Sequence, residues 1–239
     1  MRIIIYTHCF QPLPAWMPFY ITTCGANPDI QWVILTDRAE PGALTHNVRV
    51  RKITIEEMRE SIHKITGILP ACDGGGYKVC DWRPFFGLMF EDEISGYDYW
   101  GHCDLDVFWG NIRKFIPVDT GYDVITGGGP GYCGPFTLYR NNETACNLWR
   151  RAPTLMGMLY EPEIQLFEET GVSLVRANSR REMIHAYPPK TATRHADGSV
   201  TSGGKDVAFF HFRPYKKLTW DIPVNSAEWV IDKDMLHGT

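Results

Sequence analysis

The sequence predicts an α/β fold with a mixed, mostly parallel sheet flanked by helices, in one domain spanning residues 1–239. Ile3 to Tyr6 is a short apolar run, which is typical of a strand buried on both faces of a parallel sheet. Trp16 to Cys24 predicts a helix, and Trp32 to Thr36 predicts the second buried strand. Because no internal repeat or linker divides the chain, we expect a single domain.

Helix and turn signals recur along the rest of the chain. Thr54 and Glu57 form a capping box for a helix that is expected to run to about Thr66. Asp81 is expected to cap another helix, with Pro84 in its first turn. The remaining expected elements are strands over Tyr122–Thr126, Phe136–Arg140 and Val207–Phe212, helices after Asn142 and over Glu161–Thr170, and a mobile polar loop over 188–205.

Composition narrows the class of protein. The formal net charge is −4 and no long basic block occurs, which disfavours nucleic acid as a main partner. Seven cysteines at irregular spacings, with no Cys-x-x-Cys, predict reduced thiols in a cytoplasmic protein. No apolar run approaches the ~18 residues of a membrane span, and the N-terminus does not read as a signal peptide.

The most informative residues are Asp104 and Asp106, which follow the aromatic run that begins at Tyr99. Side chains at positions i and i+2 of an extended segment point the same way, and two carboxylates about 6–7 Å apart repel by about 2–3 kcal/mol at an effective dielectric near 20. A divalent cation removes that cost, and carboxylate oxygens suit Mg²⁺ or Mn²⁺ that also binds substrate phosphates. The alternative is a solvated turn after a strand.

His211 is a candidate third ligand. It lies within an apolar run, where a buried histidine needs a polar partner. A core histidine satisfied by another group is the alternative, and His8 and His102 are expected to be structural or to line a substrate site. Four cations are candidates for contacting a metal-bound diphosphate: Lys78, Arg83, Lys216 and Lys217.

A family resemblance connects these residues. The stretch from Tyr77 to Leu88, continuing from Tyr97 to Asp106, resembles bacterial GT-A-type glycosyltransferases with an Asp-x-Asp motif. More narrowly, it is similar to an uncharacterised group among polysaccharide-biosynthesis proteins. Further matching stretches are Tyr6–Phe10, Asn27–Pro28, Thr36–Asp37 and Gly134–Asn141.

The C-terminal stretch His211 to Trp220 is similar to the closing motif of glycogenin-like transferases, although Pro214 stands near that motif's glycine. This resemblance implies that His211 completes a metal site with Asp104 and Asp106, and that Lys216 or Lys217 contacts the diphosphate. It also favours retention of the anomeric configuration. An inverting enzyme instead needs a carboxylate base, for which Glu161, Glu163, Glu168 and Glu169 are available.

The resemblance further implies which residues meet the substrates. Residues 1–110 would form a nucleotide-binding half that ends in the two aspartates, and residues 111–239 an acceptor half. The expected nucleotide-sugar residues are Thr7, His8, Phe10, Asp37, Lys78, Asp81, Arg83, Asp104 and Leu105. The expected acceptor residues are Gly134, Phe136 and Thr137.

The implied activity is a hexosyl transfer that depends on Mn²⁺ or Mg²⁺, from a nucleotide-diphosphate sugar such as a UDP-sugar. The acceptor would be a glycan or a lipid-linked oligosaccharide of bacterial capsule or lipopolysaccharide, reached by peripheral contact with the inner membrane. Two other interpretations remain open. A metal-dependent nucleotidyltransferase or phosphohydrolase would also clamp a diphosphate, and a non-catalytic carbohydrate-binding protein would need only the aromatic side chains.

Overall fold

The computed structural model describes residues 1–116, 121–127, 132, 134–180, 185–186, 191–213, 220, 223–226, 228–231 and 236–238. Its central sheet has the strand order β3-β2-β1-β4-β7-β6-β8. In that order the strands are Val48–Lys52, Ile30–Thr36, Ile3–His8, Tyr99–Cys103, Phe136–Arg140, Val124–Thr126 and Ser179–Arg180. The strands from β3 to β4 are parallel, β7 runs antiparallel to β4 and β6, and β8 is parallel to β6. The predicted α/β class with a mixed sheet is confirmed.

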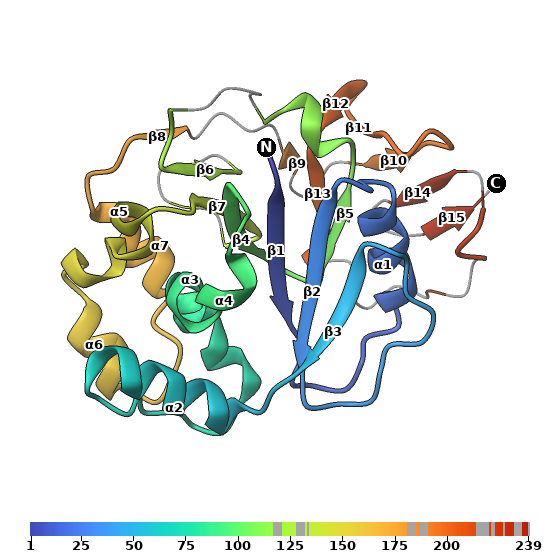
Figure 1. The fold of residues 1–239 in the computed structure, drawn as a ribbon. Helices are drawn as coiled ribbons and strands as arrows, with labels where there is room; N and C mark the ends of the chain where they lie inside the picture. The colour runs from blue at the N-terminus through green and yellow to red at the C-terminus, as the bar shows by residue number, and fades with distance from the viewer. Residues whose placement is uncertain are drawn as a thin grey trace.

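Helices cover both faces of this sheet (Figure 1). On one face, α1 (Met17–Gly25) packs its buried residues against Ile3, Ile5 and Ile34, every second position of strands β1 and β2. On the other face, Ile4 and Tyr6 join a core that includes α2 (Ile55–Thr66) and α3 (Phe86–Met89). Alternate residues of both strands are therefore buried on opposite faces, as the continuous apolar runs predicted.

Short helices complete the second face. They are the 3-10 helix η1 (Gly76–Phe85), α4 (Glu91–Ile94), α5 (Glu143–Cys146), the 3-10 helix η3 (Leu148–Arg151), α6 (Leu155–Tyr160), α7 (Phe167–Thr170) and the 3-10 helix η4 (Val172–Leu174). A further 3-10 helix, η2 (Ile112–Lys114), follows β5 (Val107–Trp109).

Two smaller sheets lie beside the central one. One has the order β12-β11-β10-β14-β15, formed by Lys205–Val207, Val200–Ser202, Ala192–Arg194, Trp229–Ile231 and Leu236–Gly238. The other has the order β5-β13-β9, in which β13 is Phe209–His211 and β9 is His185–Ala186. Phe108, Phe210 and Trp229 belong to a third apolar cluster between these strands, together with Phe19 of α1.

Two predicted helix starts are confirmed. The Thr54 hydroxyl accepts the Glu57 N–H, the Glu57 carboxylate accepts the Thr54 N–H, and the helix ends at a left-handed glycine, Gly67. The Asn142 side chain accepts the Ala145 N–H, although α5 extends only to Cys146.

Three other predictions are wrong. Asp81 does not cap a helix but lies inside η1, where its carboxylate accepts the N–H groups of Gln165 and Phe167. Because those N–H groups are used by Asp81 and Leu166 is left-handed (φ 53°), the helix predicted from Glu161 exists only as α7. The predicted loop over 188–205 contains strands β10 and β11 in its described part, since Ala192 and Val200 pack into the third apolar cluster.

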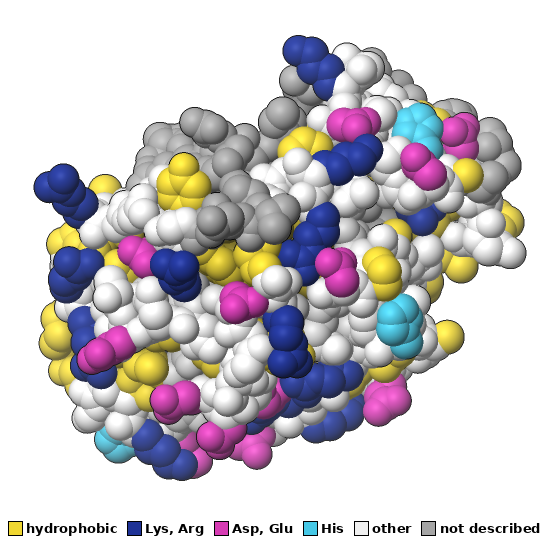
Figure 2. All heavy atoms as spheres, turned by 45° about the horizontal axis from the view of Figure 1, so that its top comes forward, with side chains coloured by type: hydrophobic (Ala, Val, Ile, Leu, Met, Phe, Trp, Pro, Cys, Tyr) yellow, Lys and Arg dark blue, Asp and Glu magenta, His cyan; other side chains and the backbone are white. Residues whose placement is uncertain are grey.

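Acidic and basic side chains are interspersed among the described residues on the face that Figure 2 shows. Among the described residues, no helix combines the length and the apolar character that crossing a membrane demands.

Candidate active site

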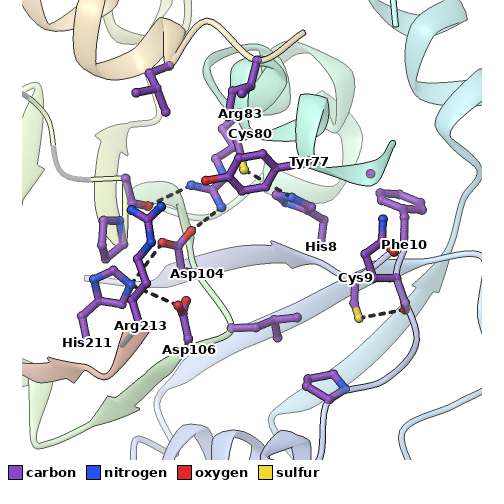
Figure 3. A pocket seen from close by; sticks show the side chains of 18 of the residues that line it. His8, Cys9, Phe10, Tyr77, Cys80, Arg83, Asp104, Asp106, His211 and Arg213 are labelled. Atoms are coloured by element: carbon purple, nitrogen blue, oxygen red, sulfur yellow. Dashed lines mark hydrogen bonds and ion pairs between the residues drawn. The ribbon is translucent and has the colours of Figure 1, made fainter. Parts of the chain in front are cut away.

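Asp104, Asp106 and His211 meet at the carboxyl end of β4 (Figure 3). His211 Nε2 lies 3.3 Å from Asp106 Oδ2 and 3.8 Å from Asp104 Oδ2. One ligand atom from each side chain falls within 4.8 Å of the others. The fold thus brings His211, more than 100 positions further along the chain, into one cluster with the two aspartates.

Strand pairing sets the position of His211. Strand β13 runs antiparallel to β5, and this register places His211 opposite Val107. The N–H of Phe212 then donates to the carbonyl of Asp106 at 3.0 Å. The histidine and the second aspartate therefore occupy neighbouring positions in one ladder, which limits how far either can move.

The turn between β4 and β5 is held from both sides. The backbone N–H of Asp104 donates to the carbonyl of Pro135 at 3.2 Å, in the segment before β7. The indole N–H of Trp16, beside α1, donates to the carbonyl of Leu105 at 3.1 Å. Both aspartates are presented by a backbone that two separate elements anchor.

The cluster suits a metal ion. Asp106 and His211 are buried, whereas the Asp104 side chain is 23% exposed, so one side of the group is open. Two carboxylates and one imidazole form a donor set for a divalent cation that keeps positions for water or substrate oxygens. A cation there would also reduce the repulsion between two carboxylates that each place an oxygen within 4.8 Å of the other.

A cavity of about 570 Å³ opens onto this group, within the usual size range of small-molecule sites. His8 and Phe10, at the end of β1, line one wall, and Tyr77, Cys80 and Arg83 of η1 line the next (Figure 3). The remaining lining residues are Cys9, Gln11, Pro12, Pro14, Trp16, Gly76, Asp104, Leu105, Asp106, Gly134, Pro135, Ile164, Leu166, Glu168, Glu169, His211 and Arg213.

Arg83 connects the Asp104, Asp106 and His211 group to the opposite wall. Its Nη2 lies 2.5 Å from Asp104 Oδ1, while its Nη1 lies 2.9 Å from the Gly134 carbonyl and 3.2 Å from Glu168 Oε1. Burial opposes the charged guanidinium, but the Asp104 and Glu168 carboxylates outweigh it and hold the pKa of Arg83 well above its usual value. The pocket therefore contains a permanent positive charge next to the candidate metal ligands Asp104, Asp106 and His211.

Glu168 is a buried partner of that charge. It pairs with Arg83 and also with His102, whose Nε2 lies 2.7 Å from Glu168 Oε2. Burial alone would raise the pKa of Glu168, yet His102 and Arg83 lower it below its usual value. Glu168 is consequently an anion that positions Arg83.

Glu169 differs from its neighbour. The residue is exposed, and partial desolvation, together with the Glu168 carboxylate, raises the pKa of Glu169. Of the four carboxylates considered as bases, Glu168 and Glu169 line the pocket, whereas Glu161 and Glu163 do not.

The wall formed by His8 and Cys80 is uncharged. The His8 Nε2 lies 3.6 Å from Cys80 Sγ, and burial, with Arg83 and His102 nearby, holds the pKa of His8 well below its usual value. Burial raises the pKa of the Cys80 thiol to about 12. Both groups are neutral at pH 7 and suit an uncharged part of a ligand.

The structure brings together eight of the residues predicted for the site. His8, Phe10, Arg83, Asp104, Leu105, Asp106, Gly134 and His211 all line the cavity. Six others do not line it: Thr7, Asp37, Lys78, Asp81, Phe136 and Thr137. Lys216 and Lys217 lie outside the described residues.

Each of these six has another place in the fold. Lys78 and Asp81 form a fully buried ion pair of 2.9 Å, and Asp37 pairs with Arg38 at 3.3 Å. Thr7 is buried within β1, and Phe136 and Thr137 are buried within β7. The polar members were expected at the site from the family resemblance or, for Lys78, from its charge, but a side chain close to a site along a helix or strand often points the other way.

Tyr77, Cys80, Trp16 and Leu166 were not predicted as lining residues. Tyr77 and Cys80 are contained in the stretch that carries the resemblance, yet nothing in their type distinguishes them from core residues. Leu166 lies in a segment predicted as helix, so its left-handed backbone had no sequence signal.

The model of a family described as a family of unknown function, DUF6625, matches residues 3–202. No curated protein matches the chain.

Several solved structures are similar to the chain at low identity. A structure of the galactosyltransferase LgtC with donor and acceptor sugar analogues has 10% identity and a TM-score of 0.44, over 79% of this chain and 76% of that one. Mouse xyloside xylosyltransferase 1 has 12% identity and a TM-score of 0.38, over 67% and 72%. A glycosyltransferase involved in glycosylation of the major capsid of PBCV-1 has 11% identity and a TM-score of 0.42, over 88% and 93%.

Proposed function

The chain belongs to the DUF6625 family, and we propose that it is a metal-dependent glycosyltransferase that uses a nucleotide-diphosphate sugar. The observation that carries this proposal is the Asp104, Asp106 and His211 group at the floor of a cavity that Arg83 also enters. A cation site and an arginine on the same cavity form a receptor for a diphosphate, which carries several adjacent negative oxygens.

The remaining walls suit the other parts of such a donor. The neutral surface of His8 and Phe10 fits a nucleoside base, for which uridine is the candidate from the resemblance. The cavity volume of about 570 Å³ is ample for a bound small molecule. Lys216 or Lys217 remains a further predicted contact to the diphosphate.

In the proposed reaction, Asp104, Asp106 and His211 would hold Mn²⁺ or Mg²⁺. When bound, the cation supplies Lewis-acid stabilisation of the leaving diphosphate. Arg83 donates N–H groups toward the same oxygens, and Glu168 keeps its guanidinium in place. An acceptor hydroxyl then attacks the anomeric carbon as the nucleoside diphosphate departs.

The acceptor side is proposed at Gly134, next to Glu168 and Glu169. A hexosyl group as cargo, a glycan or lipid-linked acceptor, and a role in capsule or lipopolysaccharide assembly come from the resemblance alone, as do a cytoplasmic location and peripheral contact with the inner membrane. The resemblance also favours retention, whereas inversion needs a carboxylate near the acceptor. The configuration of the product therefore depends on whether a carboxylate, Glu168 or Glu169, acts as a base on the acceptor hydroxyl or no such base acts.

The test is to incubate the protein with a panel of nucleotide sugars, with Mn²⁺ or EDTA, and to identify the released nucleotide by mass spectrometry. We expect one donor to release an intact nucleoside diphosphate in a metal-dependent way. Asp106→Asn should abolish the release, and Asp92→Asn, an exposed aspartate of α4, is the matched control.

The outcomes separate the three interpretations. Release of pyrophosphate or a nucleoside monophosphate instead would favour the nucleotidyltransferase or phosphohydrolase. Sugar binding that survives Asp106→Asn, without turnover by the wild-type protein, would favour a carbohydrate-binding protein.

A further inference from the structure

Two successive carboxylates of α7 converge on one glycine. A Cβ atom added to Gly134 would lie 2.8 Å from Glu169 Oε1 and 3.1 Å from Glu168 Oε1. The carbonyl of the same glycine accepts from Arg83, which also pairs with Asp104 of the metal group. The α7 carboxylates therefore lie beside Gly134, where the acceptor side of the cavity is proposed.

The two carboxylates are in different situations. Glu168 is buried and engaged by both Arg83 and His102, so its oxygens are occupied. Glu169 lines the cavity and has no ion-pair partner among the described residues, and the backbone N–H of Gly134 holds it by a hydrogen bond. Asp104 and Asp106 belong to the metal group. Glu169 is thus the pocket carboxylate left for a neutral hydroxyl.

The fold places Glu169 by a specific device. Asp81 accepts the N–H groups of Gln165 at 2.8 Å and Phe167 at 2.9 Å, and Leu166 between them takes a left-handed conformation. Helix α7 begins directly after this turn, which directs Glu168 and Glu169 together into the cavity. A left-handed, non-glycine residue that lines a pocket is the kind of strain that functional sites retain.

We infer that Glu169 is the catalytic base that accepts the proton of the acceptor hydroxyl, an inference that rests on the proposed function. As the hydroxyl oxygen bonds to the anomeric carbon, its proton moves to a Glu169 carboxylate oxygen. The bond from the anomeric carbon to the diphosphate oxygen breaks, and its electron pair leaves with the nucleoside diphosphate. Attack opposite the leaving group inverts the anomeric configuration, which replaces the retention that the resemblance favoured.

The raised pKa of Glu169 agrees with this role, which is inferred from the geometry. Glu168, Asp104 and Arg83 are the charged groups that act on Glu169, and desolvation with the neighbouring carboxylate makes it a stronger base than a free glutamate.

The experiment compares Glu169→Gln with Glu60→Gln, an exposed residue of α2 remote from the cavity, using the donor that the wild-type protein cleaves and water as the probe acceptor. General bases contribute about 10²–10⁴-fold. We therefore expect kcat of Glu169→Gln to fall by about that factor, while the donor KM and the thermal shift produced by UDP and Mn²⁺ match those of Glu60→Gln.

A second measurement does not depend on any variant. Proton NMR of the first sugar released by the wild-type protein should show the anomer opposite to that of the donor. Equal kcat for the two variants, or release of the retained anomer, would overturn the inference and leave the proposed function standing. No nucleoside diphosphate release by the wild-type protein would overturn both.

Discussion

The Lys78 ammonium lies 2.9 Å from Asp81 Oδ2, and both side chains are completely buried. Lys78 also donates to the carbonyls of Met158 and Glu163, each at 3.0 Å. This ion pair therefore ties η1 to the segment that precedes α7. Its function is to position the wall that carries Glu168 and Glu169, which is a different role from the ligand contact expected from the sequence.

Asp81→Asn should destabilise the protein strongly. Breaking a buried ion pair by removing one partner costs about 3–5 kcal/mol, because it leaves the other charge buried and uncompensated. Lys78→Met should cost less, since Asp81 keeps two backbone N–H donors. Urea unfolding measures both, with Asp92→Asn as the exposed control. Equal stability of Asp81→Asn and the control would contradict the structural role.

Manganese should stabilise the wild-type protein through Asp106 and His211. A ligand at a hundredfold excess over its dissociation constant raises the apparent stability by about 2.7 kcal/mol. Asp106→Asn and His211→Gln should lose this rise in melting temperature, whereas Asp92→Asn keeps it. Electron paramagnetic resonance of free Mn²⁺ counts the bound ion directly. The site is disproved if both substituted proteins still bind one manganese with wild-type affinity.

Acidification should destabilise the protein through His8. The folded protein holds the pKa of His8 well below its usual value, whereas the unfolded chain binds a proton near pH 6.5. Stability therefore falls as the pH drops below about 6.5, at no more than ~1.4 kcal/mol per pH unit for this group.

The measurement is the urea midpoint at pH 7.5 and pH 5.5. His8→Gln should lose less stability between these values than the wild-type protein does. His46→Gln, which alters an exposed histidine, should behave as the wild-type protein. The same pH dependence in all three proteins would show that His8 is protonated in the folded state.

Gly134→Ala tests the position of Glu169 without removing a functional group. The added Cβ would lie 2.8 Å from Glu169 Oε1, so the carboxylate must move away from the acceptor side. We expect a lower kcat with unchanged binding of UDP and Mn²⁺. Gly121→Ala is the control, because a Cβ there meets nothing within 4 Å. Wild-type turnover by Gly134→Ala would mean that the position of this carboxylate does not matter.

The sequence predicted correctly the helix starts that depend on contacts between residues close together in the chain. The capping box at Thr54 and the Asn142 cap are side-chain contacts over three residues, and both were recoverable from the order of residues alone. The helix predicted over Glu161–Thr170 failed because its N–H groups bond to Asp81, more than 80 positions earlier. No pattern within the segment carries that information.

By itself, the sequence determined the α/β class and the burial of Ile3 to Tyr6 on both faces of the sheet, and it singled out Asp104, Asp106 and His211 as candidate metal ligands. Tertiary structure alone decided that the pairing of β13 with β5 brings His211 to within 3.3 Å of Asp106, and that Lys78 and Asp81 are buried while Glu168 and Glu169 face the cavity. The reason is that residue type and spacing specify hydrophobic faces and caps, whereas the direction of a polar side chain depends on backbone groups that distant strands and turns supply.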